Sequence, residues 1–501
     1  MKEIRISTSN LYGDLQKSMG RLRSGSDRVQ KSRKIVENAL TDGNAYYGIN
    51  TGFGGLASRR ISSEQLEQLQ RNLIISHSVG VGDLVPREIS RLMLQLKIHT
   101  LGIGYSGVSL PVFERLLKFE ELDLISCIPS RGSLGASGDL APLAHMSLPL
   151  IGEGTFWGQN SEPVPARKLL EYHGLEPVTL QAKDGLSLIN GTQLMSAYGA
   201  WILEQLPHTL ALADLLAAMS IEAIQGSITP FDSRIQQVRP HPGQAKVAEN
   251  IRFLLQESEI LESHRHCGKV QDPYCLRCVP QVHGATRDAI AHVAEVIDRE
   301  INSVNDNPLV FENGDIISGG NFHGQPLALA LDYAAIAIAE LASISERRTY
   351  LLLEGHDGLP ELLMKETGIN SGFMMPQYTA AALVSENKVL CHPASVDSIP
   401  TSLGQEDHVS MGSISAVKLL QVFKNVQHVL AIELMTAAQA LDFRQPLKPG
   451  VGVEFAHRYV RSVIPHVEQD VVYNNYLSLC HKIVTSRDLV GHITENLGPL
   501  H

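Results

Sequence analysis

The sequence predicts a mainly α-helical protein built around long bundle helices. Residues 192–224 and 411–443 are rich in apolar side chains and contain few helix breakers, which is typical of long buried helices. Alternation of apolar and polar residues, the pattern of half-buried strands, is scarce. Glycine-rich segments at residues 42–55, 132–138 and 318–324 separate the helical blocks. Loops held by rigid helices commonly carry chemistry, so we expect the functional residues there.

Two further helices are predicted near the N-terminus. Ser62 and Gln65 form a capping-box pattern ahead of leucines at helical spacing, which predicts a helix that begins there and runs toward His77. Another helix is expected after Pro86, because proline is favoured at the start of a helix. The apolar residues that follow it, at positions 92, 94, 96 and 98, indicate burial on more than one face.

Composition indicates a globular chain with a large core. Of its 501 residues 44% are hydrophobic and 19% are charged, and this length allows two or three average domains or one large helical body. The net charge is −11, with no run of Lys and Arg, so we expect no nucleic-acid partner.

Several features favour a cytoplasmic protein with no membrane partner. The N-terminus lacks the apolar stretch of a signal peptide. The most apolar helical segment, residues 327–344, contains Asp332 and Glu340, so it is expected to be a buried core helix. Six cysteines in a chain of this length do not form a disulfide framework, which fits a reducing compartment.

The tripeptide Ala136-Ser137-Gly138 can become an electrophile without any external cofactor. In a strained turn the Gly138 amide nitrogen can attack the Ala136 carbonyl, because Gly138 has no Cβ to block the approach. Loss of water from the ring, and of the Ser137 hydroxyl with its α-hydrogen, leaves an exocyclic methylidene conjugated to a carbonyl. Gly132 and Gly135 also allow a phosphate-binding loop, but the Lys-Ser/Thr of a P-loop is missing.

The string GSLGASGDLAPLAHMSLPLIGEG, residues 132–154, resembles the prosthetic-group segment of the histidine and aromatic amino acid ammonia-lyases. Their electrophile is 4-methylideneimidazol-5-one (MIO). Further motifs of the family follow in its order from Tyr47 to Met411. The resemblance implies a mainly α fold with a long central helical bundle, like that of fumarase and argininosuccinate lyase.

The resemblance also implies an organisation into two regions. Residues 1–200 are expected to carry the MIO loop and the Tyr47 loop. Residues 201–501 are expected to form the helical-bundle region and to contribute substrate-binding loops. The family further implies a homotetramer whose active sites draw on more than one subunit.

The resemblance assigns roles to residues in the first region. The loop YYGINTGFGGL, residues 46–56, supplies Tyr47 as the candidate base, which needs nearby positive potential to ionise. Ser76 and His77 match the pair that helps to choose the substrate side chain, and Ser-His is the type found in histidine-specific members. Asn190, in LINGTQ, matches the asparagine that contacts the prosthetic group and the substrate amine.

The second region supplies the remaining candidates. The resemblance places Gln271 and Tyr274 around the electrophile and gives Arg277 to the substrate carboxylate, a task that suits its planar fork. Phe322 matches an aromatic residue beside the bound substrate. Glu406 stands where phenylalanine and tyrosine lyases carry glutamine, and a carboxylate can accept an imidazole N–H or exchange its proton.

Together these motifs imply that the chain removes ammonia from L-histidine to give trans-urocanate, the first step of histidine degradation. The β-hydrogen is weakly acidic, and the motifs leave open whether Tyr47 or Glu406 removes it; we favour Tyr47. Three alternatives remain. They are a MIO-dependent aminomutase, a tyrosine or phenylalanine ammonia-lyase, which Ser76-His77 and Glu406 oppose, and a catalytically inactive scaffold or metal-binding module.

One cluster of metal-binding residue types lies in the second region. Within twenty residues the sequence has His264, His266, Cys267, Cys275, Cys278 and His283. This composition can bind zinc, but zinc ribbons and fingers usually repeat paired ligands at regular spacing. Here the Cys-x-x-Cys brackets Arg277, the residue assigned to the substrate. We therefore expect no metal.

Overall fold

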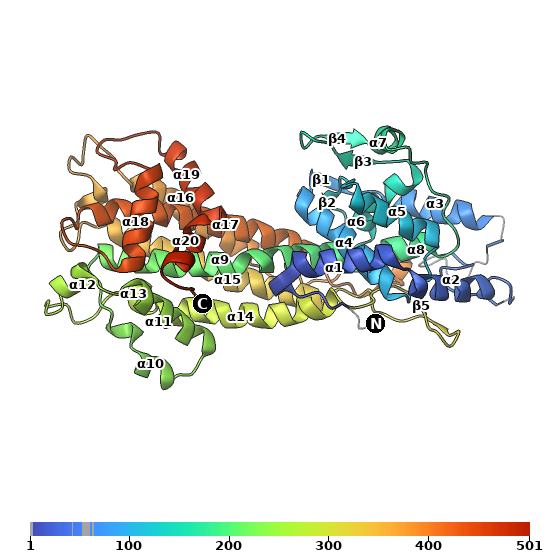
Figure 1. The fold of residues 1–501 in the computed structure, drawn as a ribbon, viewed down its shortest axis with the longest axis horizontal. Helices are drawn as coiled ribbons and strands as arrows, with labels where there is room; N and C mark the ends of the chain where they lie inside the picture. The colour runs from blue at the N-terminus through green and yellow to red at the C-terminus, as the bar shows by residue number, and fades with distance from the viewer. Residues whose placement is uncertain (1–3, 43, 53–60, 63–64) are drawn as a thin grey trace. The chain divides into compact units, whose positions relative to one another are not determined.

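The chain divides into two units in the computed structural model, which describes residues 4–42, 44–52, 61–62 and 65–501 (Figure 1). Unit 1 comprises Met1–Glu204, Val293–Asp332 and Pro393–Val417. Unit 2 comprises Gln205–His292, Tyr333–His392 and Lys418–His501. The predicted division into residues 1–200 and 201–501 stays a prediction.

The prediction of a mainly helical fold is confirmed. Four long helices each contribute residues to both units: α9 (Gln193–Ala223), α14 (Val279–Glu300), α15 (Gln325–Leu353) and α17 (Gly412–Asp442). Helices α9 and α17 occupy the segments predicted from their apolar runs, and α15 extends the predicted segment at both ends. The local apolar pattern was therefore enough to find three of these four helices, whereas α14 was not predicted.

Unit 1 contains shorter helices and all of the described β-strands. Its α-helices are α1 (Leu11–Ser24), α2 (Asp27–Ala39), α3 (Leu66–His77), α4 (Arg87–Ile103), α5 (Leu110–Glu121), α6 (Leu140–Ser147), α7 (Ala166–Tyr172) and α8 (Asp184–Ile189). The 3-10 helices are η1 (Thr8–Asn10), η4 (Leu148–Ile151) and η7 (Ser402–Gly404). Antiparallel pairs join β1 (Val81–Leu84) to β2 (Pro129–Arg131), β3 (Thr155–Trp157) to β4 (Pro163–Pro165), and β5 (Leu309–Val310) to β6 (Ile316–Ile317).

The shorter helices of unit 2 follow α9, α15 and α17 along the chain. They are η5 (Thr229–Phe231), α10 (Ser233–Gln237), α11 (Pro242–Leu254), α12 (Glu259–Ser263), α13 (Tyr274–Arg277), η6 (Glu361–Leu363), α16 (Met374–Leu390), α18 (Val451–Val463), α19 (Tyr473–Thr485) and α20 (Asp488–Asn496).

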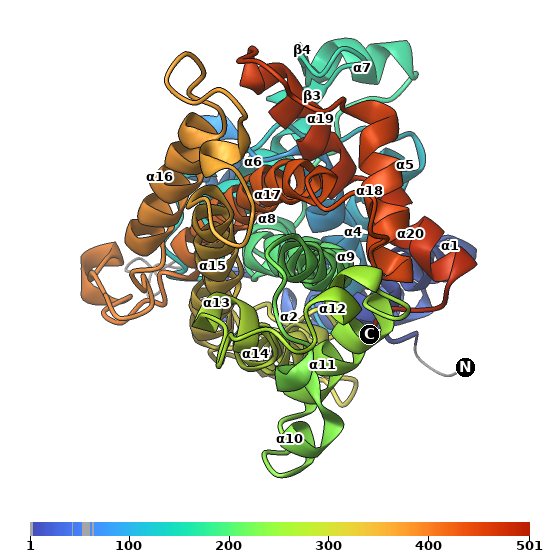
Figure 2. The same cartoon turned by 90° about the vertical axis from the view of Figure 1, so that its left-hand side faces the viewer.

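Within unit 2 the long helices are joined by buried polar contacts. Arg348 of α15 binds Glu433 of α17 through two hydrogen bonds of 2.5 and 2.8 Å, and Ser220 of α9 donates to the same carboxylate over 2.8 Å. Thr286 of α14 donates to the Ala337 carbonyl of α15 over 2.8 Å. Figure 2 shows these helices side by side. Because a buried charge without a partner is costly, these contacts favour one packing of the helices.

Helix α15 is long and apolar enough, by length and composition, to pass for a membrane span, and no other described helix is. Its most apolar window has a mean hydropathy of 1.8, and 67% of that window is buried inside the protein. This burial agrees with the core helix predicted from Asp332 and Glu340.

Helix α3 extends from Leu66 to His77, and Gln65 occupies the cap position without a side-chain cap hydrogen bond. Residues 63 and 64, where the capping-box pattern predicts the helix to begin, lie outside the described residues. The Ser62 hydroxyl lies 3.3 Å from the Gln65 side-chain oxygen, while the Gln65 amide donates to the Ser62 carbonyl over 3.0 Å. The two side chains therefore face each other and not the backbone amides. Helix α4 begins directly after Pro86 as predicted.

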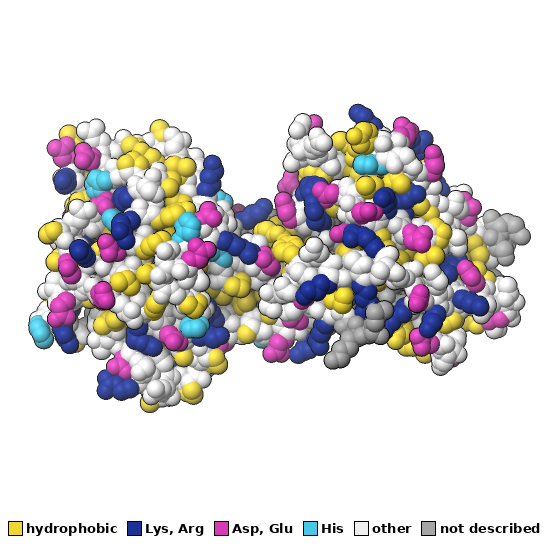
Figure 3. All heavy atoms as spheres, in the orientation of Figure 1, with side chains coloured by type: hydrophobic (Ala, Val, Ile, Leu, Met, Phe, Trp, Pro, Cys, Tyr) yellow, Lys and Arg dark blue, Asp and Glu magenta, His cyan; other side chains and the backbone are white. Residues whose placement is uncertain are grey.

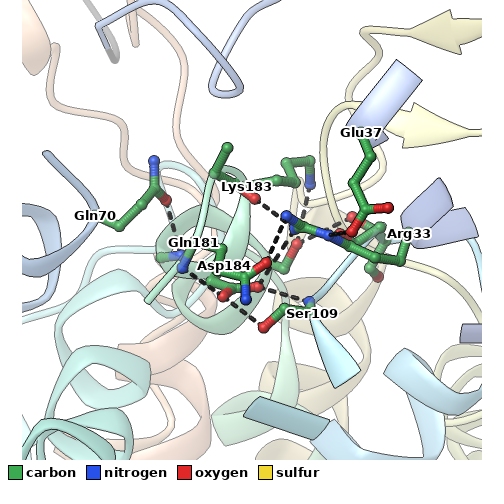
Figure 4. A network of polar contacts seen from close by, with 12 residues as sticks. Arg33, Glu37, Gln70, Ser109, Gln181, Lys183 and Asp184 are labelled. Atoms are coloured by element: carbon green, nitrogen blue, oxygen red, sulfur yellow. Dashed lines mark hydrogen bonds and ion pairs between the residues drawn. The ribbon is translucent and has the colours of Figure 1, made fainter. Parts of the chain in front are cut away.

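A buried ion network fixes the start of α8, which leads to Asn190 (Figure 4). Asp184 is fully buried and accepts hydrogen bonds of 2.7 Å from the Ser109 amide, the Ser109 hydroxyl and the Gln181 amide. Arg33 of α2 donates to the Gln181 side chain and to the Ala182 carbonyl, both over 2.8 Å. Burial raises the pKa of Asp184 and these hydrogen bonds oppose the rise.

On the face in Figure 3, positive and negative side chains are interspersed over both units. Such mixing is usual for the solvated surface of a globular protein.

Candidate active site

The tripeptide lies in a tight turn between β2 and α6. Ala136 pairs with Gly138 in an isolated bridge, and Gly138 pairs with Gly191. Gly138 has φ +78°, and a Cβ there would lie 2.0 Å from the Gly191 carbonyl oxygen. Only glycine fits this position, because a side chain would meet backbone in a left-handed conformation. The turn therefore holds the Gly138 backbone close to Ala136, as the proposed cyclisation requires.

Ser137 stands between Asn190 and Glu406. Its hydroxyl donates to Glu406 Oε1 over 2.9 Å, and its carbonyl accepts from Asn190 Nδ2 over 3.0 Å. Asn190 Oδ1 is buried and has no hydrogen-bond partner among the described residues. A buried acceptor without a partner lowers the stability of the fold. Asn190 therefore has, beside the tripeptide, a hydrogen-bonding site that no described residue uses.

Asp139, the residue after the tripeptide, anchors the turn to the start of α9. Its carboxylate accepts from the amides of Leu194 and Met195, over 2.9 and 3.1 Å, and from the Ser413 hydroxyl over 2.7 Å. Burial raises the pKa of Asp139 to about 6, and these hydrogen bonds limit the rise. The position of the turn therefore depends on α9 and on the first turn of α17.

Ser410 lies where two glycine-rich segments meet. A Cβ on Gly135 would lie 2.2 Å from the Ser410 hydroxyl, and one on Gly324 would lie 2.9 Å from it. The neighbouring Met411 amide donates to the Leu134 carbonyl over 2.9 Å. Residues 132–138, 318–324 and 398–411 thus pack together in unit 1. Two of these segments are the glycine-rich loops expected to be functional.

Phe322 lies half-buried in the second of these segments. The adjacent His323 ring stacks on His408 at 5.8 Å between centroids, and its Nε2 lies 3.1 Å from the His408 carbonyl oxygen. This contact ties the Phe322 turn to the segment that carries Glu406.

Lys97 of α4 is fully buried behind Asn190. Its ammonium donates to the Asn190 carbonyl over 2.7 Å. Desolvation lowers the pKa of Lys97 to about 7, although the charge of Asp306 opposes that shift. Lys97 thereby fixes the backbone of the residue whose side chain reaches Ser137.

His77 ends α3 with its ring turned back onto the helix. Its Nδ1 lies 2.9 Å from the Leu73 carbonyl and 3.1 Å from the Ser76 hydroxyl. A carbonyl can only accept, so Nδ1 carries the proton and Nε2 is left as an acceptor. Burial lowers the pKa of His77, and the charge of Glu406 opposes this shift. The negative charge of Glu406 therefore favours the protonated form of His77.

Tyr47 lies half-buried at the start of the turn at residues 47–50 in unit 1. Part of the motif that identified it, residues 53–56, lies outside the described residues. The preceding Tyr46 donates its hydroxyl to Asp42 over 2.6 Å.

Gln271, Tyr274 and Arg277 belong to unit 2. Gln271 and Arg277 line a cavity of about 740 Å³ together with His264 and Lys269. The Arg277 guanidinium lies 4.6 Å from the centre of the Tyr274 ring, and its Nε is buried without a hydrogen-bond partner among the described residues. Cationic side chains and an unused donor suit this cavity for an anionic group.

The His and Cys residues at positions 264–283 show no metal-binding arrangement, since the described part of the chain holds no group of three or more suitable ligands. The His264 ring nitrogens lie 2.7 and 3.0 Å from the carbonyl oxygens of Ile260 and Gly226. His283 is buried with Nδ1 2.7 Å from Asp214. These two rings are thus engaged by other partners.

Sequence reasoning missed Lys97, Asp139 and Ser410. The sequence itself pointed to two of these three residues. Asp139 follows the tripeptide directly, and Lys97 interrupts a run of buried apolar positions in α4. A charged residue at such a position is rarely buried without a partner. Ser410 gave no signal, because its role depends on segments far away in the sequence.

Comparison of the sequence with known proteins indicates one family. The model of the aromatic amino acid lyases matches residues 19–462. The chain belongs to this family. Histidine ammonia-lyase of Sorangium cellulosum (strain So ce56) is 51% identical over 488 residues, which are 95% of this chain and 94% of that protein. Histidine ammonia-lyase of Anaeromyxobacter dehalogenans (strain 2CP-C) is 52% identical and covers 89% of each chain.

Solved structures agree with this membership. The crystal structure of histidine ammonia-lyase from Trypanosoma cruzi has a TM-score of 0.86 and 42% identity, and covers 94% of this chain and 89% of its own. Tyrosine aminomutase from Streptomyces globisporus has a TM-score of 0.90 at 33% identity, and covers 99% of this chain and 100% of its own. Lyases and aminomutases therefore share this fold, and only the sites can distinguish them.

Proposed function

We propose that the chain removes ammonia from L-histidine without oxidation and gives trans-urocanate, using MIO formed from Ala136-Ser137-Gly138 and no external cofactor. The observation that carries this proposal is the Glu406 carboxylate hydrogen-bonded to the Ser137 hydroxyl. Relatives about half identical to this chain and named histidine ammonia-lyase agree with it.

The residues around the tripeptide fit the proposed group. Gly138 has no room for a Cβ, so only glycine keeps the turn that pairs it with Ala136. Asn190 donates to the Ser137 carbonyl, and its Oδ1 has no hydrogen-bond partner in the described part of the chain. When formed, the group supplies the electrophile that makes the substrate amine a better leaving group. Asn190 is placed to stabilise negative charge that develops on the carbonyl of residue 137.

Recognition of the imidazole is assigned to Glu406 and His77. The Glu406 carboxylate can accept a ring N–H, and the neutral His77 Nε2 offers a second acceptor, which suits the protonated imidazole because both of its ring nitrogens carry N–H groups. A phenyl ring would leave both unpaired, and a site built for hydrogen bonds rejects such analogues strongly. Tyr47 is our preferred base for the β-proton, with Glu406 as the alternative.

The substrate carboxylate is assigned to Arg277, and the surroundings of the electrophile to Gln271 and Tyr274. All three belong to unit 2, and the Tyr274 side chain is 70% exposed. We propose that in a homotetramer these residues complete the active site of another subunit, and that the protein works in the cytoplasm without nucleic-acid or membrane partners.

Exposed apolar side chains on the unit 2 parts of α15 and α16 support assembly. They are Tyr333, Ile336, Met375, Tyr378 and Val389. Exposed apolar side chains gathered on neighbouring helices commonly mark protein interfaces.

An aminomutase reaction is the second candidate, because tyrosine aminomutase shares the fold at a TM-score of 0.90. The carboxylate of Glu406 and the histidine ammonia-lyase relatives favour simple deamination. Prolonged incubation with histidine, followed by a search for β-histidine, separates the two. Accumulation of β-histidine would favour the aminomutase.

Substrate choice is the direct test of the proposed function. We expect wild-type protein to form urocanate from histidine, followed by its absorbance, and to discriminate against phenylalanine and tyrosine by about 10⁴. Replacing Ser76-His77 by His-Leu, together with Glu406→Gln, should lower histidine activity and relax the discrimination. A wild-type preference for tyrosine or phenylalanine would overturn the substrate assignment.

Arg277→Lys should raise KM for histidine by about ten- to hundredfold although the charge is kept. Lysine cannot reproduce the two-pronged carboxylate contact, and one charge-assisted hydrogen bond contributes about 1.5–3 kcal/mol. Steady-state kinetics measure this, with Arg265→Lys, at an exposed arginine of the same cavity, as the matched control. An unchanged KM would place the carboxylate elsewhere.

A further inference from the structure

Residues 401–406 form a closed turn that places Thr401 directly opposite Glu406. The Thr401 amide donates to the Glu406 carbonyl over 2.9 Å, and the Glu406 amide donates back over 3.3 Å. Ser402, Leu403 and Gly404 complete the turn with φ of +52°, +58° and +83°. Residues directly opposite in an antiparallel pair direct their side chains to the same face. The Thr401 hydroxyl is therefore held beside the Glu406 carboxylate.

In the chain before MIO formation the Glu406 carboxylate is bound at both oxygens. Oε1 accepts from the Ser137 hydroxyl over 2.9 Å, and Oε2 accepts from Thr401 Oγ1 over 2.8 Å. Loss of the Ser137 hydroxyl frees Oε1 and leaves the bond from Thr401 in place. A glutamate side chain loses considerable rotamer freedom when it is fixed. Thr401 is β-branched and has few χ1 choices, so it is a stiff anchor for this long side chain.

The orientation of the Glu406 side chain decides whether the substrate imidazole can be bound, because only Oε1 is available for that contact. With Oε2 occupied by Thr401, Oε1 is directed toward the tripeptide, where the substrate is proposed to bind. The charge of Glu406 also acts on His77, the other residue assigned to the imidazole. A rotated carboxylate would change both contacts at once.

We infer that Thr401 is a positioning residue that sets the preference for an imidazole side chain by orienting Glu406. This role rests on the proposed function and refines it. Thr401 acts through Glu406, so its removal should weaken recognition of an imidazole and leave recognition of a phenyl ring unchanged.

The test compares Thr401→Val, which removes the hydroxyl and keeps the shape, with Thr401→Ser, which keeps the hydroxyl. Inhibition constants are measured for trans-urocanate and for trans-cinnamate, its phenyl counterpart, alongside kcat and KM for histidine. We expect Thr401→Val to weaken urocanate inhibition and lower kcat/KM for histidine by about ten- to hundredfold, as for the loss of one charge-assisted hydrogen bond. Cinnamate inhibition should stay the same, and Thr401→Ser should remain close to wild type.

Controls separate positioning from damage to the turn. Thr41→Val removes an exposed threonine hydroxyl that donates to the Asn38 carbonyl and should change nothing. Intact mass and thermal unfolding check that each variant is folded and matured, and Thr401→Ala removes the hydroxyl in a second way if the valine variant folds poorly.

Two results would overturn the inference while histidine turnover by wild-type protein stands. One is unchanged urocanate inhibition in Thr401→Val. The other is an equal loss for urocanate and cinnamate, since that would mean general damage. A wild-type protein that does not act on histidine would instead overturn the proposed function, and this role with it.

Discussion

Ser137→Ala is expected to abolish turnover while the fold is kept. Alanine has no hydroxyl to eliminate, so the variant cannot form the methylidene. The one hydrogen bond that the Ser137 hydroxyl makes among the described residues, to Glu406, is lost in wild-type protein as well when the hydroxyl is eliminated, so its absence in the variant should not disturb the fold. The intact mass of the protein measures MIO formation directly. Wild-type protein should be lighter than its sequence by two water molecules, and the Ser137→Ala variant should not lose both.

Ser24→Ala is a matched control. Its hydroxyl donates to a backbone carbonyl at the exposed end of α1, so this variant should mature and turn over histidine like wild type. Ser137→Cys is a softer test, because a thiol can also be eliminated and partial activity would agree with the proposal. Near-normal activity in Ser137→Ala would exclude the electrophile altogether.

Tyr47→Phe is expected to lower kcat by about 10²–10⁴-fold, the contribution of a positioned general base. Substrate binding should change little, because the lost interaction belongs to the transition state. Steady-state kinetics with histidine give the division between kcat and KM.

The neighbouring tyrosine offers the control for this variant. Tyr46→Phe removes a hydroxyl that donates to Asp42, so it should leave kcat close to wild type. Glu406→Gln is measured beside both. A large loss of kcat in Glu406→Gln together with a nearly full rate in Tyr47→Phe would reverse the assignment of the base.

The helical fold could be predicted because its signals are local. Apolar runs without breakers identified α9 and α17, and Pro86 marked the start of α4. The pattern at Ser62 does not show that its hydroxyl faces the Gln65 side chain. Cap geometry depends on side-chain orientation, which spacing does not determine.

The site was predictable only in part, because its contacts are not local. Motif resemblance named Ser137, Asn190 and Glu406, and the structure places them in hydrogen-bond contact. Their catalytic roles stay predictions. Thr401 lies close to Glu406 in the sequence, but spacing does not show that the two side chains meet. The signal at Lys97 indicates a buried charge and not its partner, the Asn190 carbonyl, which only the folded chain brings near.

The packing around Ser410 and Ser413 has a consequence for the order of events during synthesis. The amide of Met411 binds the Leu134 carbonyl, and Ser413 binds Asp139, so the tripeptide turn is completed by residues more than 270 positions later in the chain. A ribosome releases the N-terminal part first, and a nascent chain that stops before residue 393 has neither Glu406 nor these anchors. The surroundings that we propose for the electrophile are therefore complete only when most of the protein has been made.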